Sequence, residues 1–382
     1  MTRTSNRSSK IAASMLAAAL AGSMCIPATA FADSQQELIP VGDPIAATSV
    51  KAGNYSVTIS ANNRFFKPTQ AVLSIDKKDA TVSFDHTGYD FAWLGTIEEY
   101  ETAEKAGDVT ADPRYIRGVE TTALASAGWL KPGSRFTLPI TNLNEPFSIT
   151  VNNPAKEEMF ERKICVNCAD KSALVAAANV NVSVSKAGEL ASDTNATLSP
   201  MAQRQVVATD TNNDGKVSCS EVLAKVGTKY MPDEKALAKY SVIKGGKLVE
   251  KTATVKDGDS IVAFTYAKKG KDSYTKFNKS TATVKVGKTL NLTLKGIEVK
   301  KANGKNKLTT VKGTKKITVT CSERFVDDDA ANVTVPEPKK LSKNGTVSLK
   351  FKTAGTYVVT AKGKTAKGST IIAPVCLVTV TK

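Results

Sequence analysis

The sequence predicts a mainly β protein built of tandem β-sandwich or Ig-like modules, with a short helix that follows one loop of distinctive spacing. Short stretches alternate apolar and polar side chains, which is typical of strands that bury one face. Only 6% of the 382 residues are aromatic, while Thr, Val, Gly and Lys are abundant, as in sandwiches with many turns. After an N-terminal leader, about 350 residues remain, enough for two to three domains.

The predicted organisation has five parts. We expect a signal peptide over residues 1–32, a linker over 33–50, an N-terminal β-sandwich over 51–170, a middle module over 171–296 and a C-terminal sandwich over 297–382.

The leader has the pattern of a secretory signal peptide. Basic residues precede an apolar stretch over 11–26, and Ala30-Phe31-Ala32 has the small-x-small form of a cleavage site. Cys25 suggests a lipoprotein as an alternative, but Met24 stands where a small residue would precede a lipidated cysteine. No later segment is apolar for long enough to span a membrane. We therefore expect an exported protein, secreted or held non-covalently at a surface, with no transmembrane segment after signal removal.

Alternating stretches predict the strands of the N-terminal sandwich, and an acidic run over 97–105 predicts a short helix. The strands are expected at 55–60, 71–75, 80–84, 135–140 and 147–151. The run from Phe65 through 88–90 and 94–99 to 160–162 resembles an uncharacterised β-sandwich module of Gram-positive surface proteins.

Capture of haem is an alternative function for this module, because sandwiches of this size can bind haem through a strand tyrosine. The paired-tyrosine spacing of such proteins is absent. Tyr89, Trp93, Tyr100 and Tyr115 are more simply core or loop aromatics, and His86 is expected to be a solvated residue at a strand end.

Five cysteines follow the leader, an odd number for an oxidising compartment. We expect Cys165 and Cys168 to form a small disulfide loop, because a redox CxxC needs a helix after a strand and a zinc site needs two more soft ligands. Cys321 and Cys376 are each in the middle of a predicted strand, at inward-facing positions, which predicts a buried bridge between them. Cys219 would then be the unpaired thiol.

Residues 210–221 have the spacing of a calcium loop. Asp210, Asn212 and Asp214 alternate, Gly215 is sixth and Glu221 is twelfth, which matches the EF-hand pattern. Calcium prefers six to eight oxygen ligands, and a tight loop turns alternate side chains inward. The alternative is a plain Asp-Gly turn, which does not account for Glu221 followed by apolar residues at helical spacing.

Six residues would supply oxygens to a Ca²⁺ ion. The set comprises the side chains of Asp210, Asn212 and Asp214, the backbone carbonyl of Lys216, Ser218 directly or through a water, and both carboxylate oxygens of Glu221. Only three are acids, so the affinity should be modest, on the order of 10⁻⁴–10⁻³ M. Val217 should attach the loop to a neighbouring strand.

The residues flanking the loop predict a strand before it, over 205–209, and a helix after it, over 220–230. This order resembles Gram-positive exported or cell-surface proteins with a single, dockerin-like EF-hand loop between β-sandwich or Ig-like modules. A single loop between β-modules is suited to rigidifying their junction. Strands at 179–185, 260–266 and 288–294 should complete the middle module, whose order is similar to that of exported proteins with a transcobalamin-like or ubiquitin-like ligand module.

Strands at 316–321, 346–351, 355–361 and 374–380 predict the C-terminal sandwich. The segment 354–357 and the last strand resemble those of bacterial Ig-like surface repeats.

The C-terminal part of the chain is strongly basic. Residues 229–382 contain 31 lysines and one arginine against 12 acidic residues. These lysines are either the solvated faces and protected edges of sandwiches or a surface that attracts an anionic cell-wall polymer, an acidic glycan or a host surface. Nucleic acid is not expected as a partner, because arginine and interleaved aromatics are nearly absent.

The sequence does not predict an enzyme. A single histidine excludes HExxH zinc chemistry, and no nucleophile elbow or phosphate loop is present; Ser183-Val-Ser-Lys186 lies on a predicted strand without companion motifs. We expect a secreted or surface-associated calcium-binding modular protein for adhesion or ligand binding. The alternatives are a small-ligand capture protein, for haem or a corrinoid, and a glycan-active enzyme, which needs two carboxylates facing one cleft.

Overall fold

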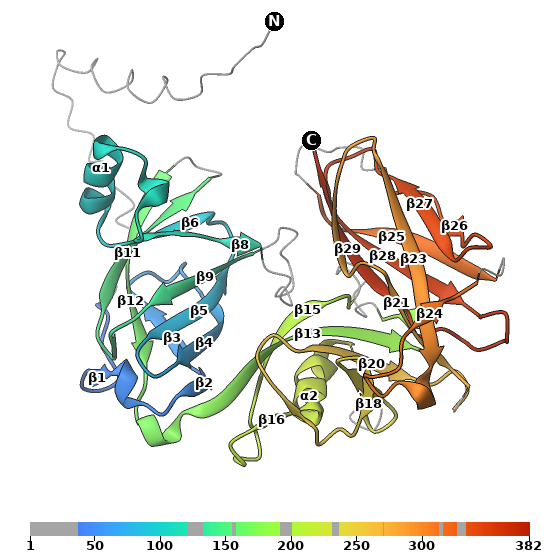
Figure 1. The fold of residues 1–382 in the computed structure, drawn as a ribbon. Helices are drawn as coiled ribbons and strands as arrows, with labels where there is room; N and C mark the ends of the chain where they lie inside the picture. The colour runs from blue at the N-terminus through green and yellow to red at the C-terminus, as the bar shows by residue number, and fades with distance from the viewer. Residues whose placement is uncertain are drawn as a thin grey trace, which may run out of the picture. The chain divides into compact units, whose positions relative to one another are not determined.

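The computed structural model describes residues 37–120, 133–154, 158–191, 201–230, 237–269, 271–312, 316–326 and 334–382. The predicted signal peptide and Cys25 lie outside these residues. Within them the fold is mainly β, as expected, with two α-helices (Figure 1). Neither of these helices is long and apolar enough to cross a membrane. Four short 3₁₀ turns lie between these elements: η1 (Ala47–Ser49), η2 (Val109–Ala111), η3 (Lys171–Ala173) and η4 (Val299–Lys301).

The N-terminal sandwich packs two layers of strands over one core. The first layer is a five-stranded sheet in the order β3 (Thr58–Ala61), β12 (Glu158–Asn167), β11 (Phe147–Asn153), β6 (Phe91–Leu94) and β7 (Tyr115–Arg117). The second layer is part of an 11-stranded sheet, in the order β2 (Gly53–Ser56), β4 (Thr69–Ile75), β5 (Ala80–His86), β9 (Ser134–Pro139) and β8 (Val119–Glu120). Leu73, Val82 and Phe136 of the second layer share the core with Ile149 and Ile164 of the first. This packing explains the period-2 alternation of these strands.

The helix predicted from the acidic run is confirmed as α1 (Ile97–Ala106). Thr96 caps its N-terminus in a capping box: the Thr96 hydroxyl accepts from the Glu99 N–H, and the Glu99 carboxylate accepts from the Thr96 N–H.

Two expectations for the N-terminal sandwich are wrong. The strand predicted over 55–60 is two strands, β2 and β3, in different sheets, because the chain changes layer at Val57. Residues 45–50 are not a linker: β1 (Ile45–Ala46) pairs with β10 (Asn142–Leu143), and Ala47 and Val50 are buried in the core.

The middle of the chain is built on β13 (Val175–Lys186), which continues the 11-stranded sheet from β2. The other strands of this part of the sheet are β14 (Glu189–Leu190), β15 (Arg204–Thr209), β17 (Ser241–Lys244), β18 (Lys247–Val249) and β20 (Ser260–Thr265). Helix α2 (Cys219–Tyr230) covers them, and Figure 1 shows it beside β13 and β15. Its apolar residues Val222, Leu223 and Val226 are buried against residues such as Val182 and Val206.

The C-terminal strands form a second sandwich. One sheet contains β21 (Ser273–Phe277), β23 (Thr289–Glu298), β24 (Thr309–Thr310) and β27 (Thr346–Lys350). The other has the order β22 (Thr281–Lys285), β29 (Val375–Thr381), β28 (Gly355–Gly363), β25 (Ile317–Val326) and β26 (Lys339–Lys340). Leu292 and Leu349 of the first sheet share a core with Val319, Val359 and Val378 of the second.

The strand expected at 288–294 forms, but with different neighbours. As β23 it pairs with β27 and β21, and its Leu290, Leu292 and Leu294 belong to the C-terminal core. It therefore does not complete the middle module, as we expected from its position in the chain.

Neither predicted disulfide is present, and all five cysteines of the described residues are unbridged. Cys321 on β25 and Cys376 on β29 both stand opposite Val359 of β28, the strand between them. Two strand spacings separate their Cα atoms by about 9.6 Å, beyond the limit of about 7 Å for a bridge. Burial raises the pKa of Cys321 to about 12 and that of Cys376 to about 11.

The Cys165–Cys168 loop fails for a similar reason. Ile164, Val166 and Cys168 belong to the sandwich core, whereas Cys165 alternates to the other face of β12. Cys165 and Cys168 are three positions apart, and extended chain of that length spans roughly 10 Å, beyond the limit of about 7 Å between Cα atoms for a bridge. Cys168 is held by Asn144, whose side chain bonds both its N–H and its C=O at 2.7 Å.

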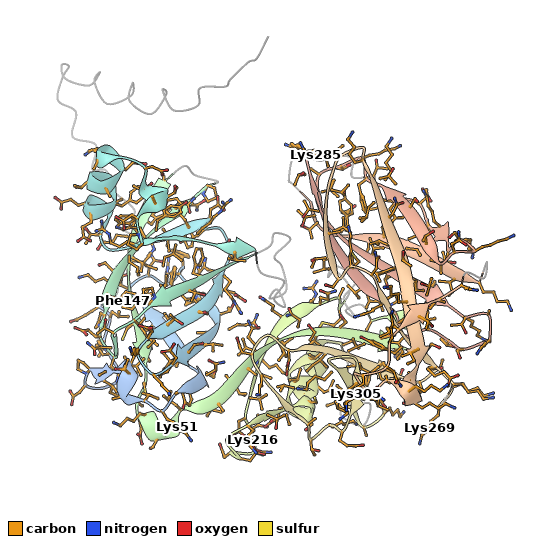
Figure 2. All side chains as sticks on the ribbon, in the orientation of Figure 1. Lys51, Phe147, Lys216, Lys269, Lys285 and Lys305 are labelled. Carbon is orange, nitrogen blue, oxygen red and sulfur yellow. The ribbon has the colours of Figure 1, made fainter. Side chains whose placement is uncertain are left out.

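Lysines occupy the outer faces of the C-terminal sandwich (Figure 2). On β27, for example, Lys350 is exposed and Leu349 is buried. The edge strand β26 consists of two exposed lysines, a feature that discourages pairing with another chain.

Candidate functional site

The predicted calcium loop lies between β15 and α2, so the expected order of strand, loop and helix is confirmed. Val217 is buried and, in the two-residue strand β16 (Val217–Ser218), pairs with Val255 of β19 (Thr254–Val255). The loop is therefore attached at three places: to the sheet through β15, to the core through α2 and to β19 through Val217.

Asp210, the first position of the loop, is 4% exposed and folds the loop back on itself. Its Oδ2 accepts from the Gly215 N–H at 2.7 Å, and its Oδ1 accepts from the Asp214 N–H at 3.2 Å. Gly215 has a φ of +81°, a left-handed conformation that a side chain would strain.

Asn212 and Asp214 continue this inward series. The Asn212 Oδ1 accepts from the Asp214 N–H at 3.0 Å, and the Asp214 Oδ1 accepts from the Lys216 N–H at 2.9 Å. Both side chains are exposed, as is Lys216, whose predicted ligand is the backbone carbonyl. The side-chain oxygens of Asp210, Asn212 and Asp214 are thus turned toward the backbone of the loop.

Glu221, the twelfth position, is 8% exposed and joins the two ends of the loop. Its Oε2 accepts from the Ser218 N–H at 2.8 Å and from the Ser218 hydroxyl at 2.9 Å. Its Oε1 accepts from the N–H and hydroxyl of Thr211. Burial by itself would raise the pKa of Glu221, but the hydrogen bonds from Ser218 and Thr211 outweigh it and lower the pKa.

Part of this arrangement is also a helix cap. Ser218 and Glu221 have the S-x-x-E spacing of a capping box at the start of α2, and the Glu221 N–H bonds back to the Ser218 hydroxyl at 3.4 Å. This capping role was not predicted, although the spacing is visible in the sequence. Thr211 was not predicted either, because the calcium pattern contains no signal for it.

The donor set has the chemistry that calcium prefers, since all six predicted ligands are oxygens. The three carboxylates of the loop do not by themselves converge: among the described residues, no group of three or more His, Cys, Asp or Glu side chains is placed to hold a metal. Asp210 and Glu221 direct their oxygens to N–H and O–H donors of the loop. A calcium ion would use the remaining lone pairs of these oxygens together with the amide, hydroxyl and carbonyl oxygens.

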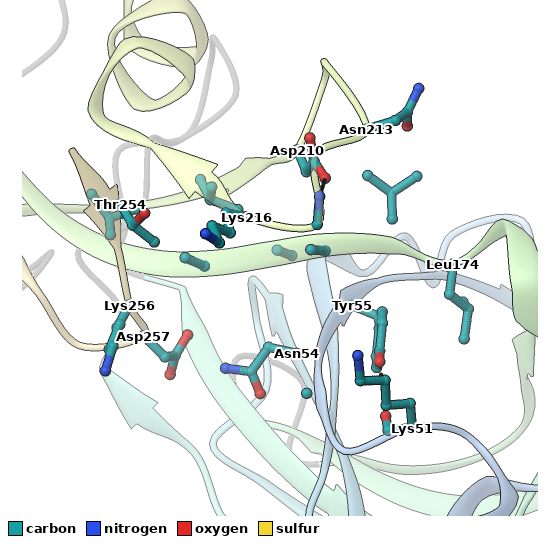
Figure 3. A pocket seen from close by; sticks show the side chains of 18 of the residues that line it. Lys51, Asn54, Tyr55, Leu174, Asp210, Asn213, Lys216, Thr254, Lys256 and Asp257 are labelled. Atoms are coloured by element: carbon teal, nitrogen blue, oxygen red, sulfur yellow. Dashed lines mark hydrogen bonds between the residues drawn. The ribbon is translucent and has the colours of Figure 1, made fainter. Parts of the chain in front are cut away.

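A hollow of about 700 Å³ adjoins the loop (Figure 3). Asp210 and Lys216 line it on the loop side, and Lys51 and Tyr55 line it on the side of the N-terminal sandwich. Asp257 also lines it, but its Oδ1 accepts from the Asn179 N–H at 2.8 Å. The two carboxylates that line the hollow, those of Asp210 and Asp257, therefore both accept hydrogen bonds from backbone N–H groups.

In the stretch Ser183-Val-Ser-Lys186, the hydroxyls of both serines accept hydrogen bonds from backbone N–H groups. The Ser183 hydroxyl accepts from the Gln203 N–H at 2.9 Å, and the Ser185 hydroxyl accepts from the Ala373 N–H at 3.1 Å. Both serines are buried on β13.

The aromatic residues considered for haem are placed as core and loop residues, as expected. Tyr89, Trp93 and Tyr100 are buried, and Tyr115 is half-buried. His86 differs from the prediction: at the end of β5, its ring packs against both Phe66 and Tyr89, at ring-centroid distances of 4.7 Å and 4.5 Å. Burial lowers the pKa of His86 to about 4.

Acidification is expected to destabilise the N-terminal sandwich through His86. The pKa of this side chain is about 4 in the folded state and 6.5 as a free group, so the unfolded state binds the proton first. The stabilising effect of the neutral ring is complete above pH 6.5 and is lost as the pH falls toward 4. Between pH 7 and pH 4.5 we expect a loss of about 2–3 kcal/mol.

Urea unfolding at the two pH values, followed by tryptophan fluorescence, measures this loss. His86→Phe keeps a stacking ring and should remove that part of the pH dependence. Since the chain contains one histidine, no other imidazole contributes. An unchanged pH dependence in the variant would contradict the prediction.

Neither a protein-family model nor a curated protein matches the sequence. Among solved structures, the chain is similar to the fibronectin(III)-like modules of Clostridium thermocellum CbhA, at 7% identity and a TM-score of 0.19, over 53% of this chain and 93% of that chain. It is also similar to the immunoglobulin domains 1–4 of Sidekick-1, at 8% identity and a TM-score of 0.16, over 82% of each chain. A third similarity is to the D0-D1 domain of Intimin, at 10% identity and a TM-score of 0.17, over 78% of this chain and 90% of that chain. These scores are too low to carry an argument on function.

Proposed function

We propose that this protein is an exported, non-catalytic, calcium-binding modular protein that acts in adhesion or ligand binding. The observation that supports it is the closed loop over residues 210–221, in which Asp210 accepts from Gly215 and Glu221 joins Thr211 to Ser218. Export rests on the signal-peptide pattern, and the absence of a catalytic motif favours binding over catalysis.

Calcium at this loop would have a structural effect. Asp210 directly follows β15, and Glu221 lies in the first turn of α2, so an ion held by both would tie the sheet to the helix that covers it. Val222 and Leu223, next to Glu221, are buried in the core of this part of the chain. Ion binding would therefore stabilise the middle module as a whole.

Thermal unfolding in calcium tests the proposal. With a dissociation constant on the order of 10⁻⁴–10⁻³ M, about 10 mM calcium should stabilise the wild-type chain by about 1.4–2.7 kcal/mol. This corresponds to a rise of several degrees in Tm. The rise should be absent in Glu221→Gln.

Glu221→Gln removes the charge and keeps one accepting oxygen for the Ser218 N–H, but its amide nitrogen then faces the Thr211 N–H, which loses its acceptor. Without calcium, the variant should therefore melt somewhat below the wild type, and the test is the calcium-dependent rise in Tm of each chain. Asp257→Asn is the matched control: it removes a neighbouring carboxylate outside the loop and should keep the full calcium response. The proposal fails if the wild type shows no calcium response, or if Glu221→Gln keeps it.

A further inference from the structure

Six exposed lysines line a hollow of about 820 Å³ at one end of the C-terminal sandwich. They are Lys268, Lys271, Lys316, Lys362, Lys364 and Lys367. This differs from the outer faces of the strands, where lysines alternate along a single element.

The lysines converge because three separate segments meet here: the chain around Lys268 and Lys271, the start of β25, and the end of β28 with residues 364–370. The turn after β13 is a fourth lining segment, which contributes Glu189 but no lysine. The Ser273 N–H donates to the Thr370 carbonyl at 2.9 Å. At Gly188, φ is +92° and a Cβ would lie 2.6 Å from the Thr370 side chain. The segments are thus held close together by backbone contacts, and the hollow is part of the fold.

The acids of the hollow neutralise little of this charge. Asp272 is 3% exposed, and its carboxylate accepts from the N–H groups of Ala267 and Lys268. Glu189 forms an exposed ion pair with Lys362 at 3.1 Å. With two carboxylates against six lysines, the hollow keeps a positive charge that raises the local concentration of anions.

A second hollow, of about 550 Å³, shares Lys367 and extends the basic surface. Lys301, Lys307 and Lys312 also line it. Glu298, the one acid among the described residues that line it, lies 3.5 Å from the ammonium of Lys301 and 3.6 Å from that of Lys300. Positive charge therefore continues across both hollows, over a surface suited to an extended ligand.

We propose that the two hollows together bind an acidic polysaccharide that carries an anionic group on most of its repeats. Among the described residues, neither hollow is lined by an arginine, a tryptophan, a tyrosine or a phenylalanine. Bases therefore have no stacking partner, whereas lysine ammonium groups serve as point charges for any carboxylate or sulfate. This inference specifies the partner class of the proposed binding role and is independent of calcium.

Titration of the full chain with heparin at increasing salt tests the inference. The variant Lys316→Gln, Lys364→Gln, Lys367→Gln should bind at least about tenfold more weakly at about 0.15 M salt. The slope of log Kd against log salt should fall by about two, because fewer counterions are released.

The matched control is Lys285→Gln, Lys288→Gln, Lys352→Gln, which removes the same charge from three exposed lysines of the same sandwich. Figure 2 labels Lys285 at one end of this sandwich and Lys269 at the other end. Lys285 pairs with Thr381, beside the Gly355 end of β28, while the hollow lies at the Gly363 end. β28 has 9 residues and is about 26–30 Å long.

The control variant should lose less than about threefold in affinity at the same salt. Equal losses in both variants would reduce the effect to net charge and overturn the inference. Tighter binding of double-stranded DNA than of heparin, lost in the hollow variant, would also overturn it. The hollow variant should still show the rise in Tm with calcium. A loss of heparin binding can therefore be told apart from a loss of the proposed calcium function.

Discussion

Replacing Arg135 with Met is expected to lower the free energy of unfolding of the N-terminal sandwich by about 3–5 kcal/mol. Arg135 on β9 stands opposite Asp85 on β5, and their side chains are 12% and 5% exposed. The guanidinium binds both carboxylate oxygens, with Nε–Oδ1 at 2.6 Å and Nη2–Oδ2 at 3.1 Å. Without it, the buried carboxylate loses a cation that binds both of its oxygens.

The same carboxylate connects two parts of the chain. The Gln70 Nε2 donates to the Asp85 Oδ2 at 3.1 Å, and the Gln70 Oε1 accepts from the Val207 N–H on β15 at 3.1 Å. Displacement of Asp85 in the variant should therefore also loosen the contact of the N-terminal sandwich with β15, the strand that leads into the calcium loop.

Urea unfolding followed by tryptophan fluorescence measures this loss locally, because Trp93 is buried in the N-terminal sandwich and Trp129 is the only other tryptophan. Arg117→Met removes an exposed arginine of the same sandwich and should have a much smaller effect. The double variant Asp85→Leu, Arg135→Met removes both charges and should recover much of the stability. If it is no more stable than Arg135→Met, the cause is not an unpaired charge.

Replacing Gly363 with Ala is expected to destabilise the C-terminal sandwich by at least about 3 kcal/mol. Gly363 ends β28 with a φ of +135°, and an added Cβ would lie 2.0 Å from the Lys316 carbonyl oxygen. Since that oxygen belongs to the backbone beside β25, neither a rotamer change nor a side-chain movement relieves the clash.

Amide hydrogen exchange of β25 and β28 measures the effect of Gly363→Ala. A loss of 3 kcal/mol accelerates exchange by global opening about a hundredfold. Gly368→Ala is the matched control: Gly368 lines the same hollow with a φ of +79°, but nothing lies within 4 Å of an added Cβ. Its exchange should change far less, and equal rates in the two variants would rule out the clash as the cause.

Local patterns predicted the secondary structure of much of the chain. The strand at 80–84, the strand at 179–185 and the helix over 220–230 are β5, β13 and α2, because alternation and helical spacing record which face of an element is buried. The calcium-loop residues are also consecutive, so their spacing alone predicted a turn that Asp210 and Gly215 close. Whether calcium binds there stays a prediction.

Pairing between distant segments could not be read in the same way. Cys321 and Cys376 alternate inward as predicted, yet both face Val359 in one sheet, and only the strand order excludes a bridge between them. For the same reason, residues 288–294 were predicted correctly as a strand but assigned to the middle module, whereas the strand belongs to the C-terminal sandwich. His86 is hydrophilic by type and at a strand end, and its burial depends on Phe66 and Tyr89.

The amino-acid order alone therefore determined a mainly β chain, its main strands and helices, one oxygen-rich loop and a strongly basic C-terminal part. The tertiary structure decided which strands share a sheet, which thiols are too far apart to bond, and where six lysines from three segments surround one hollow. The physical reason is range: alternation, capping and turn geometry act between residues a few positions apart, whereas strand order and the convergence of charges depend on packing between segments far apart in the chain.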